Sequence, residues 1–306
     1  MSGSKRECKL SANKINAGRA LDKGRAPRYN YAMLLTDIHT HSTWSADADS
    51  PLEDMVQTAR QKGLAYFGVS EHFDYDYIPA GLTYNGSPVR TDEEGYFAQA
   101  RALQRQFNGK NFTFLAGCEL GYTDDPATQN TYSALIQKFS PDFVVNSVHT
   151  CDGYDCWFGD YFDGKDKNYA YSRYLERVLR SLSAPYRYDI VAHIGYVSRN
   201  APYADPKLRY SDFAALYDAI LTGIISRGKI LEVNSSSRGE GSAFLPDTDV
   251  LARYFELGGR EVSFASDAHF VGRICAGREE VVSALKSVGF EYITVPCRGE
   301  RIKVPI

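Results

Sequence analysis

Residues 37–74 read DIHTHSTWSADADSPLEDMVQTARQKGLAYFGVSEHFD and contain one strand–helix–strand unit. The stretch starts at the end of an apolar run that closes with His39 and His41. It continues through a helical pattern over Leu52–Lys62 and ends in a second apolar run that closes with His72. Strands joined through a helix are parallel, so their carboxyl ends lie at the same edge of a sheet. The sequence therefore predicts that histidines from separate strands meet where α/β proteins place their chemistry.

The same unit recurs along the chain. Seven apolar, β-rich runs are expected to be strands: Met33–Ile38, Tyr66–Ser70, Phe112–Cys118, Phe143–Val148, Tyr188–Ala192, Ile230–Val233 and Val262–Ser266. Helical spacing is found over Leu52–Lys62, Glu93–Phe107, Gln129–Lys138, Asn168–Leu182, Ser211–Ser226, Asp247–Leu257 and Arg278–Val288. The runs are almost continuously hydrophobic, which is typical of strands buried on both faces of a parallel sheet.

Capping residues mark the expected helix ends. Start signals stand at Ser50-Pro51, at Asp92 and at Ser211-Asp212, because short polar side chains can accept hydrogen bonds from the first turn of a helix. The expected stops are glycines near positions that need a left-handed backbone: Gly63, Gly109, Gly228, Gly258 and Gly289.

The residues that end the strands favour a barrel over an open sheet. Six of the seven runs end in His, Glu or Asp, and the seventh ends in Glu232 and Asn234. In an open sheet only the strands beside a switch point reach the ligand crevice, whereas a barrel brings every strand end to one mouth. The prediction is a closed or nearly closed α/β barrel formed by one domain over residues 33–306.

Composition excludes several classes of partner. The 306 residues carry a formal net charge of −3, so no basic field is available for long nucleic acid or an anionic membrane surface. No apolar run approaches the roughly 18 residues that span a bilayer. The six cysteines are scattered without a C-x-x-C pair, a pattern typical of reduced thiols in the cytoplasm. Residues 1–32 are basic and poor in apolar residues, and they are expected to be a disordered extension or a mis-assigned start.

Six histidines and three carboxylates are the candidate metal ligands. H-x-H at His39 and His41 and D-x-H at Asp267 and His269 each place two side chains on the same side of a strand end. The full set is His39, His41, Asp47, His72, Glu119, His149, His193, Asp267 and His269. Nine nitrogen and oxygen ligands suffice for two or three divalent ions and favour Zn, Mn or Fe over Ca or Mg alone.

Some of these residues have a structural alternative. A charged Glu119 directly after a buried strand needs a partner, which could be a pair of metal ions, a helix N-terminus or a loop salt bridge. His149 and His193 stand alone, and a single histidine is usually a hydrogen-bonded structural residue. Their shared position at strand ends favours metal binding. Glu71 points away from His72 and is expected to be structural or to lie outside the ligand shell.

The order of these motifs resembles the polymerase and histidinol phosphatase (PHP) superfamily, and within it the monofunctional histidinol-phosphatases. That family combines an early H-x-H with E-H, G-x-E, isolated histidines and a late D-x-H. The matching stretches are residues 37–74, AGCELGY at 116–122, VNSVHTCDGYD at 145–155, AHIGYVSRN at 192–200, LEVNSSSRGEG at 231–241 and ELGGREVSFASDAH at 256–269. The resemblance implies an α/β fold, a distorted (β/α)7 TIM-like barrel with its metal site at the C-terminal ends of the strands.

The resemblance also implies a trinuclear site. One ion would be held by His39, His41, Glu119 and Asp267. Glu119 would bridge to a second ion, held by His149 and His193. The third ion would be held by Asp47, His72 and His269.

Two arginines match the phosphate-contacting arginines of the family. They are Arg199 and Arg238, and a guanidinium fork suits phosphate better than an ammonium does; the alternative for each is an ordinary surface arginine. Arg273 is a weaker third candidate. Two departures concern the substrate: Gly195 stands where an acidic residue often follows the histidine, and Ser237 stands where glycine is common.

The expected activity is that of a metal-dependent phosphomonoesterase. As a histidinol-phosphatase it would convert L-histidinol phosphate and water to L-histidinol and phosphate, a small-molecule reaction of histidine biosynthesis. Glu119, Asp267 and His269 would be catalytic, with metal-activated water attacking phosphorus in line. The alternatives are a PHP-family phosphoesterase acting on nucleotides or other small phosphate esters, a proofreading-type exonuclease module and a non-catalytic metal-stabilised module.

Overall fold

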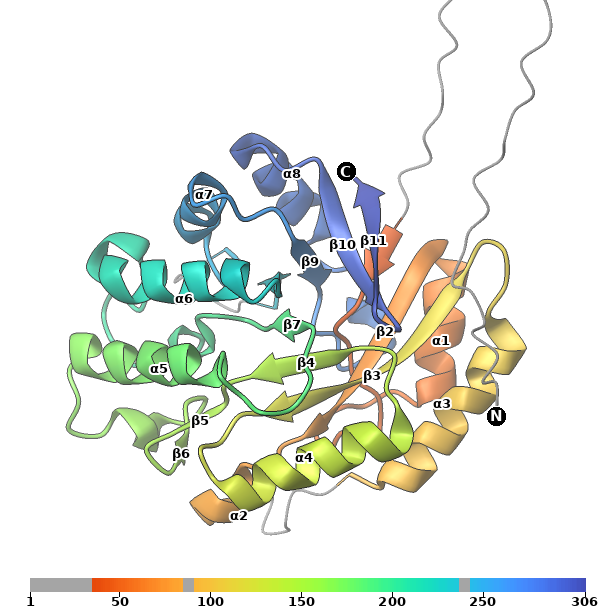
Figure 1. Ribbon diagram of the computed structural model, residues 1–306, viewed down its shortest axis with the longest axis horizontal. Coiled ribbons are helices and arrows are strands. Elements are labelled where there is room, and N and C mark those ends of the chain that lie inside the picture. Colours follow the sequence, from red (N-terminus) through yellow and green to blue (C-terminus); the bar gives the residue numbers. More distant parts are fainter. Residues whose placement is uncertain (1–34, 85–90, 237–242) are drawn as a thin grey trace, which may run out of the picture.

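Seven parallel strands form one sheet in the order β1–β2–β3–β4–β7–β8–β9 in the computed structural model, which describes residues 35–84, 91–236 and 243–306 (Figure 1). Their bounds are β1 Leu35–Asp37, β2 Leu64–Phe73, β3 Thr113–Gly121, β4 Val144–Ser147, β7 Ile190–Val191, β8 Ile230–Asn234 and β9 Val262–Ala265. Two antiparallel hairpins accompany the sheet: β5 Thr150–Cys151 with β6 Tyr154–Asp155, and β10 Tyr292–Cys297 with β11 Glu300–Pro305.

The two edges of the sheet meet and nearly close it into a barrel. The backbone amide of Ile38, just after β1, donates to the carbonyl of Phe264 in β9 (3.3 Å). Beyond the strands, the amide of Asp267 donates to His39 O and the amide of His41 to Ala268 O, both at 2.9 Å. The expected distorted (β/α)7 barrel is therefore confirmed, and its closure runs through the first and last predicted ligand motifs.

The helices lie outside the sheet and surround it (Figure 1). They are α1 Leu52–Gln61, α2 Tyr77–Ala80, α3 Glu93–Phe107, α4 Pro126–Phe139, α5 Lys167–Ser181, α6 Ala214–Ser226, α7 Thr248–Glu256 and α8 Arg278–Val288. Short 3-10 turns are η1 Gly159–Phe162, η2 Tyr196–Ser198, η3 Tyr210–Asp212 and η4 Val271–Arg273. On the described residues no helix has the length and apolar character needed to cross a membrane.

The interior of the barrel changes from apolar to polar along each strand. In β3 the alternating residues Leu115, Gly117 and Glu119 lie on the inner side, because successive side chains of a strand point to opposite faces. Leu115 belongs to a buried apolar cluster with Phe143, and a Cβ at Gly117 would lie 2.4 Å from the Phe143 ring. Glycine is required there because the buried Phe143 ring occupies the space that a Cβ would need. Glu119, one step further, begins the polar layer.

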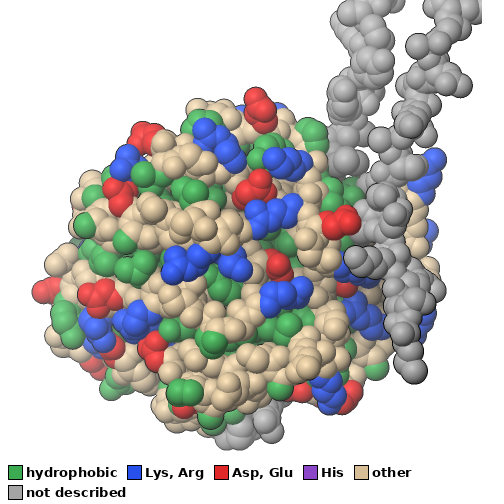
Figure 2. Space-filling model, viewed as in Figure 1, with side chains coloured by type: hydrophobic (Ala, Val, Ile, Leu, Met, Phe, Trp, Pro, Cys, Tyr) green, Lys and Arg blue, Asp and Glu red, His purple; other side chains and the backbone are tan. Residues whose placement is uncertain are grey.

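The hairpin β10–β11 closes the apolar end of the barrel. Its residues Val295, Cys297 and Val304 belong to the same buried cluster as Leu115 and Phe143. Figure 2 shows the side of the molecule that carries this hairpin. On the described part of that side, basic and acidic side chains are mixed with apolar ones and no histidine is visible. With the apolar end filled, the polar end is left to hold a site.

Several predicted boundaries were wrong for local reasons. The Ser50 hydroxyl accepts from the amide of Val271 (3.1 Å) and does not cap α1. Helix α6 begins only at Ala214, because Ser211 and Asp212 form the 3-10 turn η3. Gly109 is not a left-handed helix cap; its amide donates to Phe112 O (3.0 Å), whereas the other four predicted stops have positive φ.

Other expectations lie outside the described residues. They concern the basic segment 1–32, with Met33 of the first predicted strand, and also Ser237 and Arg238. The β5–β6 hairpin was not expected from the sequence, because strands of two residues leave no hydrophobic period to detect.

Candidate metal centre

Glu119 stands at the centre of the polar layer. It is in β3 beside His72 of β2, its direct partner in the strand register, and is fully buried. Its two carboxylate oxygens lie within 3.5 Å of ring nitrogens from five histidines. The distances are 2.9 Å to His193 and 3.3 Å to His149 from Oε1, and 2.9 Å to His72, 3.2 Å to His39 and 3.5 Å to His41 from Oε2. One carboxylate thus joins histidines from four segments: the loop after β1, strand β2, and the loops after β4 and β7.

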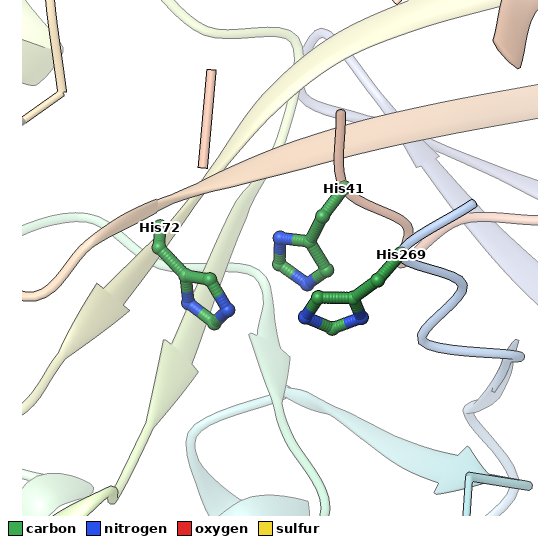
Figure 3. Close-up of side chains that lie close together, drawn as sticks. All are labelled: His41, His72 and His269. Atoms are coloured by element: carbon green, nitrogen blue, oxygen red, sulfur yellow. The ribbon is translucent and has the colours of Figure 1, made fainter. Parts of the chain in front are cut away.

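Asp267 and Asp47 extend this cluster on its outer side. Asp267 Oδ1 lies 3.2 Å from His41 Nε2, and Asp47 Oδ2 lies 3.2 Å from His269 Nε2 and 3.7 Å from His72 Nε2. The structure therefore brings all nine predicted ligands to one mouth of the barrel. In Figure 3, His41, His72 and His269 face one another from the loop after β1, from β2 and from the loop after β9.

The ligand atoms fall into four overlapping groups. Within each group the three donor atoms lie within 4.8 Å of one another. The groups are His41, His72 and His269; His39, Glu119 and His193; His39, His41 and Asp267; and His72, Glu119 and His149. Because His39, His41, His72 and Glu119 each belong to two groups, ions held here would share ligands.

Outer hydrogen bonds decide which ring nitrogen of His39 and of His149 faces inward. His39 Nδ1 lies 2.7 Å from Glu232 Oε2, and His149 Nδ1 lies 3.0 Å from Asp74 Oδ1. A carboxylate accepts only from a protonated nitrogen, so each ring donates outward through Nδ1 and is left with Nε2 facing the cluster. Carboxylate–histidine pairs of this kind orient metal ligands in proteins.

The inward nitrogens are placed where they need a cation. His39 Nε2 lies 3.1 Å from His41 Nε2, and His149 Nε2 lies 3.4 Å from His193 Nε2. A neutral ring that donates outward, as His39 and His149 do, turns the lone pair of its Nε2 toward the neighbouring ring. The fully buried Glu119 Oε2 makes no well-aligned hydrogen bond with the ring nitrogens around it. Buried acceptors without a donor are costly, and shared divalent cations would satisfy all of them. The donor set therefore fits metal ions.

The electrostatics of the cluster also favour positive charge. Burial alone would raise the pKa of Glu119, but the charges of His39, His72 and His149 hold it well below its ordinary value. Burial likewise opposes charge on His39, yet Glu232 and Glu119 raise its pKa well above the usual range. Burial lowers the pKa of His41 to about 3, so this ring is neutral and available as a ligand. The carboxylates create a potential that protons fill when no metal is bound.

Arg199 lies beside the predicted metal ligands. Its Nη2 donates to Asp267 Oδ2 (2.8 Å) and to Asn234 Oδ1 (3.3 Å). The guanidinium lies over the rings of Tyr196 and Trp157, 5.2 and 5.9 Å from their centroids. These contacts fix the fork of donors at the wall of a cleft of about 480 Å³ that opens onto the predicted metal ligands. Arg273 is not among the described residues that line this cleft.

Two outer-shell carboxylates were not singled out from the sequence. Glu232, in β8, also accepts from the amide of His193 (3.2 Å), and Asp74 lies 3.3 Å from His72 Nδ1. Signals for both existed: Glu232 is at a strand end, and Asp74 follows His72 by two residues, which keeps it on the same side. Glu71 behaves as expected, because it accepts hydrogen bonds from Ser42 on the other side of β2.

Comparisons with known proteins agree with this arrangement. The sequence pattern of the PHP domain matches residues 37–236. A probable histidinol-phosphatase of Clostridium acetobutylicum is 26% identical over 237 residues, which is 78% of this chain and 87% of that protein. The histidinol-phosphatase of Lactococcus lactis is 26% identical over 262 residues, covering 85% of this chain and 94% of the relative.

A solved structure has the same fold. It is histidinol phosphate phosphatase from Lactococcus lactis in complex with zinc, L-histidinol and phosphate. The match has a TM-score of 0.76 at 24% identity and covers 88% of this chain and 98% of the other.

Proposed function

Because the chain belongs to the PHP domain family, we propose that it is a metal-dependent histidinol-phosphatase, which hydrolyses L-histidinol phosphate to L-histidinol and phosphate. The observation that carries the proposal is Glu119, a fully buried carboxylate surrounded by five histidine nitrogens and facing a cleft that also holds Arg199. Support for this substrate comes from the names of the two relatives, each of which the chain covers almost completely.

Nine side chains would hold two or three divalent ions, with zinc, manganese and iron as the candidates. They are His39, His41, Asp47, His72, Glu119, His149, His193, Asp267 and His269. Such ions supply Lewis acidity and an activated water at neutral pH. Zinc is the first candidate, because the related Lactococcus lactis structure contains it.

The chain's own residues bind and orient the ester. Arg199 presents a guanidinium fork to phosphate oxygens at a place fixed by Asp267, which also lies 3.2 Å from His41. A clamp held in this way offsets charge that develops on the phosphoryl oxygens, without reorganisation during the reaction. Arg238, outside the described residues, remains a proposed second clamp. His269, at the outer edge of the cluster beside Asp47, would give a proton to the leaving alkoxide in a state in which its Nε2 holds no metal ion, because its Nδ1 donates to the carbonyl of Asp267 (2.9 Å).

A substrate panel with a Glu119→Gln variant tests the proposal. Wild-type protein reconstituted with Zn or Mn should hydrolyse L-histidinol phosphate with a higher kcat/KM than sugar phosphates or nucleoside monophosphates. Glu119→Gln should lose at least about 100-fold, since removal of outer-shell partners alone costs 10–100-fold. A preference for nucleotides would replace this function with a broader phosphoesterase activity. If Glu119→Gln hydrolyses the substrate at the wild-type rate, Glu119 does not hold a metal ion that the reaction needs.

A further inference from the structure

Asp155 is a carboxylate on the wall of the cleft that does not belong to the predicted ligand set. It ends strand β6, in the hairpin that follows His149, and is only 5% exposed. The hydroxyl of Tyr77 donates to its Oδ2, and Oδ1 accepts from the Trp157 amide (2.8 Å) and the Tyr196 hydroxyl (3.2 Å). All three donors are neutral.

Asp155 has no cationic partner within the part of the chain that the structure describes. No described Lys, Arg or His forms an ion pair with it, in contrast to Asp74, which contacts His149 at 3.0 Å. Burial raises the pKa of Asp155, because water no longer solvates the charge. A buried carboxylate that lines a cleft and lacks a cation would gain from a positively charged group of the ligand.

Asp155 and Arg199 both contact the side chain of Tyr196 in the cleft wall. The Tyr196 ring separates them: its hydroxyl bonds Asp155, and the Arg199 guanidinium lies over its face, 5.2 Å from the centroid. The same ring is 5.0 Å from His149 and 5.4 Å from His193, centroid to centroid. A phosphate at Arg199 and the metal ligands would therefore have its alcohol part beside Tyr196 and Trp157, within reach of Asp155.

We propose that Asp155 binds the ammonium group of the substrate's alcohol and makes the cleft selective for phosphate esters of amino alcohols. This inference rests on the proposed phosphatase function and adds the residue that chooses among esters. A carboxylate and an ammonium form a charge-assisted hydrogen bond, and the rings of Tyr77, Tyr196 and Trp157 favour a cation over their faces. Esters with an anionic or neutral alcohol would leave Asp155 buried and unpaired, so the site rejects them.

The test compares two esters that differ only in the amine. They are L-histidinol phosphate and its analogue without the amino group, each assayed with zinc-loaded protein. In the wild type the ratio of their kcat/KM values should favour the amine, and in Asp155→Asn this ratio should fall about 10- to 100-fold, as expected for a lost hydrogen bond between charged groups. Asp155→Glu keeps the charge and should retain most of the preference. Asp142→Asn, a matched exchange at the other end of the barrel, should keep the wild-type ratio.

The remaining outcomes contradict either the role of Asp155 or the proposed phosphatase function. Equal losses on the two esters in Asp155→Asn would mean that Asp155 only positions Tyr77 and Tyr196. If the variant does not fold, wild-type inhibition decides: L-histidinol should inhibit more strongly than the same alcohol without its amine, and equal inhibition overturns the inference. If the wild type hydrolyses both esters at the same rate, the role of Asp155 is refuted and the proposed phosphatase function stands. A wild type that hydrolyses neither refutes the proposed function and the inference together.

Discussion

Two of the predicted ligands have unusual backbone conformations. His193 has φ 23° and Asp267 has φ 52°, in the left-handed region that non-glycine residues rarely occupy. Such residues cost of the order of 1–3 kcal/mol each and persist only where their surroundings hold them. Here the His193 amide donates to Glu232 (3.2 Å) and the Asp267 amide to His39 O (2.9 Å). The hydrogen bond to Glu232 and the hydrogen bond that closes the barrel hold these strained conformations. The positions of His193 and Asp267 are therefore fixed by the backbone.

Glu232 is therefore expected to control metal affinity without touching a metal. Glu232→Gln would weaken the acceptor at His39 Nδ1 (2.7 Å) and let that ring turn or change tautomer. The affinity for zinc should fall about 10- to 100-fold, the usual cost of a lost outer-shell partner. Competition with a chromophoric chelator measures it, and Asp142→Asn is the control, because it is equally buried but distant. An unaltered zinc affinity in Glu232→Gln would contradict the role assigned to this hydrogen bond.

At the level of elements, Asp142 ties the apolar end of the barrel together. It lies in the loop before β4 and is 2% exposed. Its carboxylate accepts from Arg101 of α3 (3.0 Å), from the Ala116 amide of β3 (2.9 Å) and from Arg298 Nε at the β10–β11 turn (2.7 Å). The Arg298 amide also donates to Asp142 O (2.8 Å). One side chain thus holds a helix, a strand and the closing hairpin.

Asp142→Asn should destabilise the protein by about 2–3 kcal/mol at pH 7, as expected for a buried carboxylate whose partly exposed arginines lose their charge partner. Burial alone would raise the pKa of Asp142, but Arg101 and Arg298 hold it below its ordinary value. A lowered carboxyl pKa stabilises the folded state above the unfolded pKa of about 4, and this contribution is lost as the pH falls through the folded pKa.

Urea unfolding of both proteins at pH 7, 5 and 3 measures this effect. The difference in the free energy of unfolding between wild type and variant should be constant from pH 7 to 5 and should shrink below pH 4. The comparison is made at each pH, so that loss of metal in acid affects both proteins alike. A gap that grows on acidification would mean that the charge of Asp142 is not what stabilises the folded state.

The elements that the sequence predicted well are those with local signals. Helix α3 has its predicted bounds, Glu93–Phe107, because Asp92 accepts from the Gly95 amide (3.0 Å) and fixes the start. Helix α4 begins three residues before the predicted Gln129, because Asp125 accepts from the Thr128 amide and Pro126 occupies the first helical position. The sequence could indicate that the predicted ligands lie close together, because most of them stand at or just after the carboxyl ends of parallel strands. Asp155 could not, because it depends on a hairpin of two-residue strands and on distant Tyr77.

On the scale of the whole molecule, one end of the barrel stabilises the fold and the other holds the polar site. The hairpin and Phe143 fill one end with apolar side chains, and burial of that surface is the main source of stability. The other end gathers side chains from β2, β3 and β8 and from the loops after β1, β4, β7 and β9, all at a cost in desolvation. Folding without metal must therefore tolerate a charged, buried cluster that the apolar end compensates.

Metal removal should consequently lower the thermal stability of the whole barrel. Ions bind the folded protein and not the dispersed ligands of the unfolded chain, so free metal at about 1,000 times its Kd adds about 4 kcal/mol per site. For a domain of this size that corresponds to a rise in Tm of about 8 °C or more over the chelator-treated protein. Scanning calorimetry with zinc and with chelator measures the shift. Asp142→Asn should melt lower in both conditions yet keep the shift, whereas Glu119→Gln should lose most of it, because the carboxylate that joins the ligand groups is gone. Equal melting temperatures for loaded and chelated wild type would show that the nine side chains do not hold metal in the folded protein.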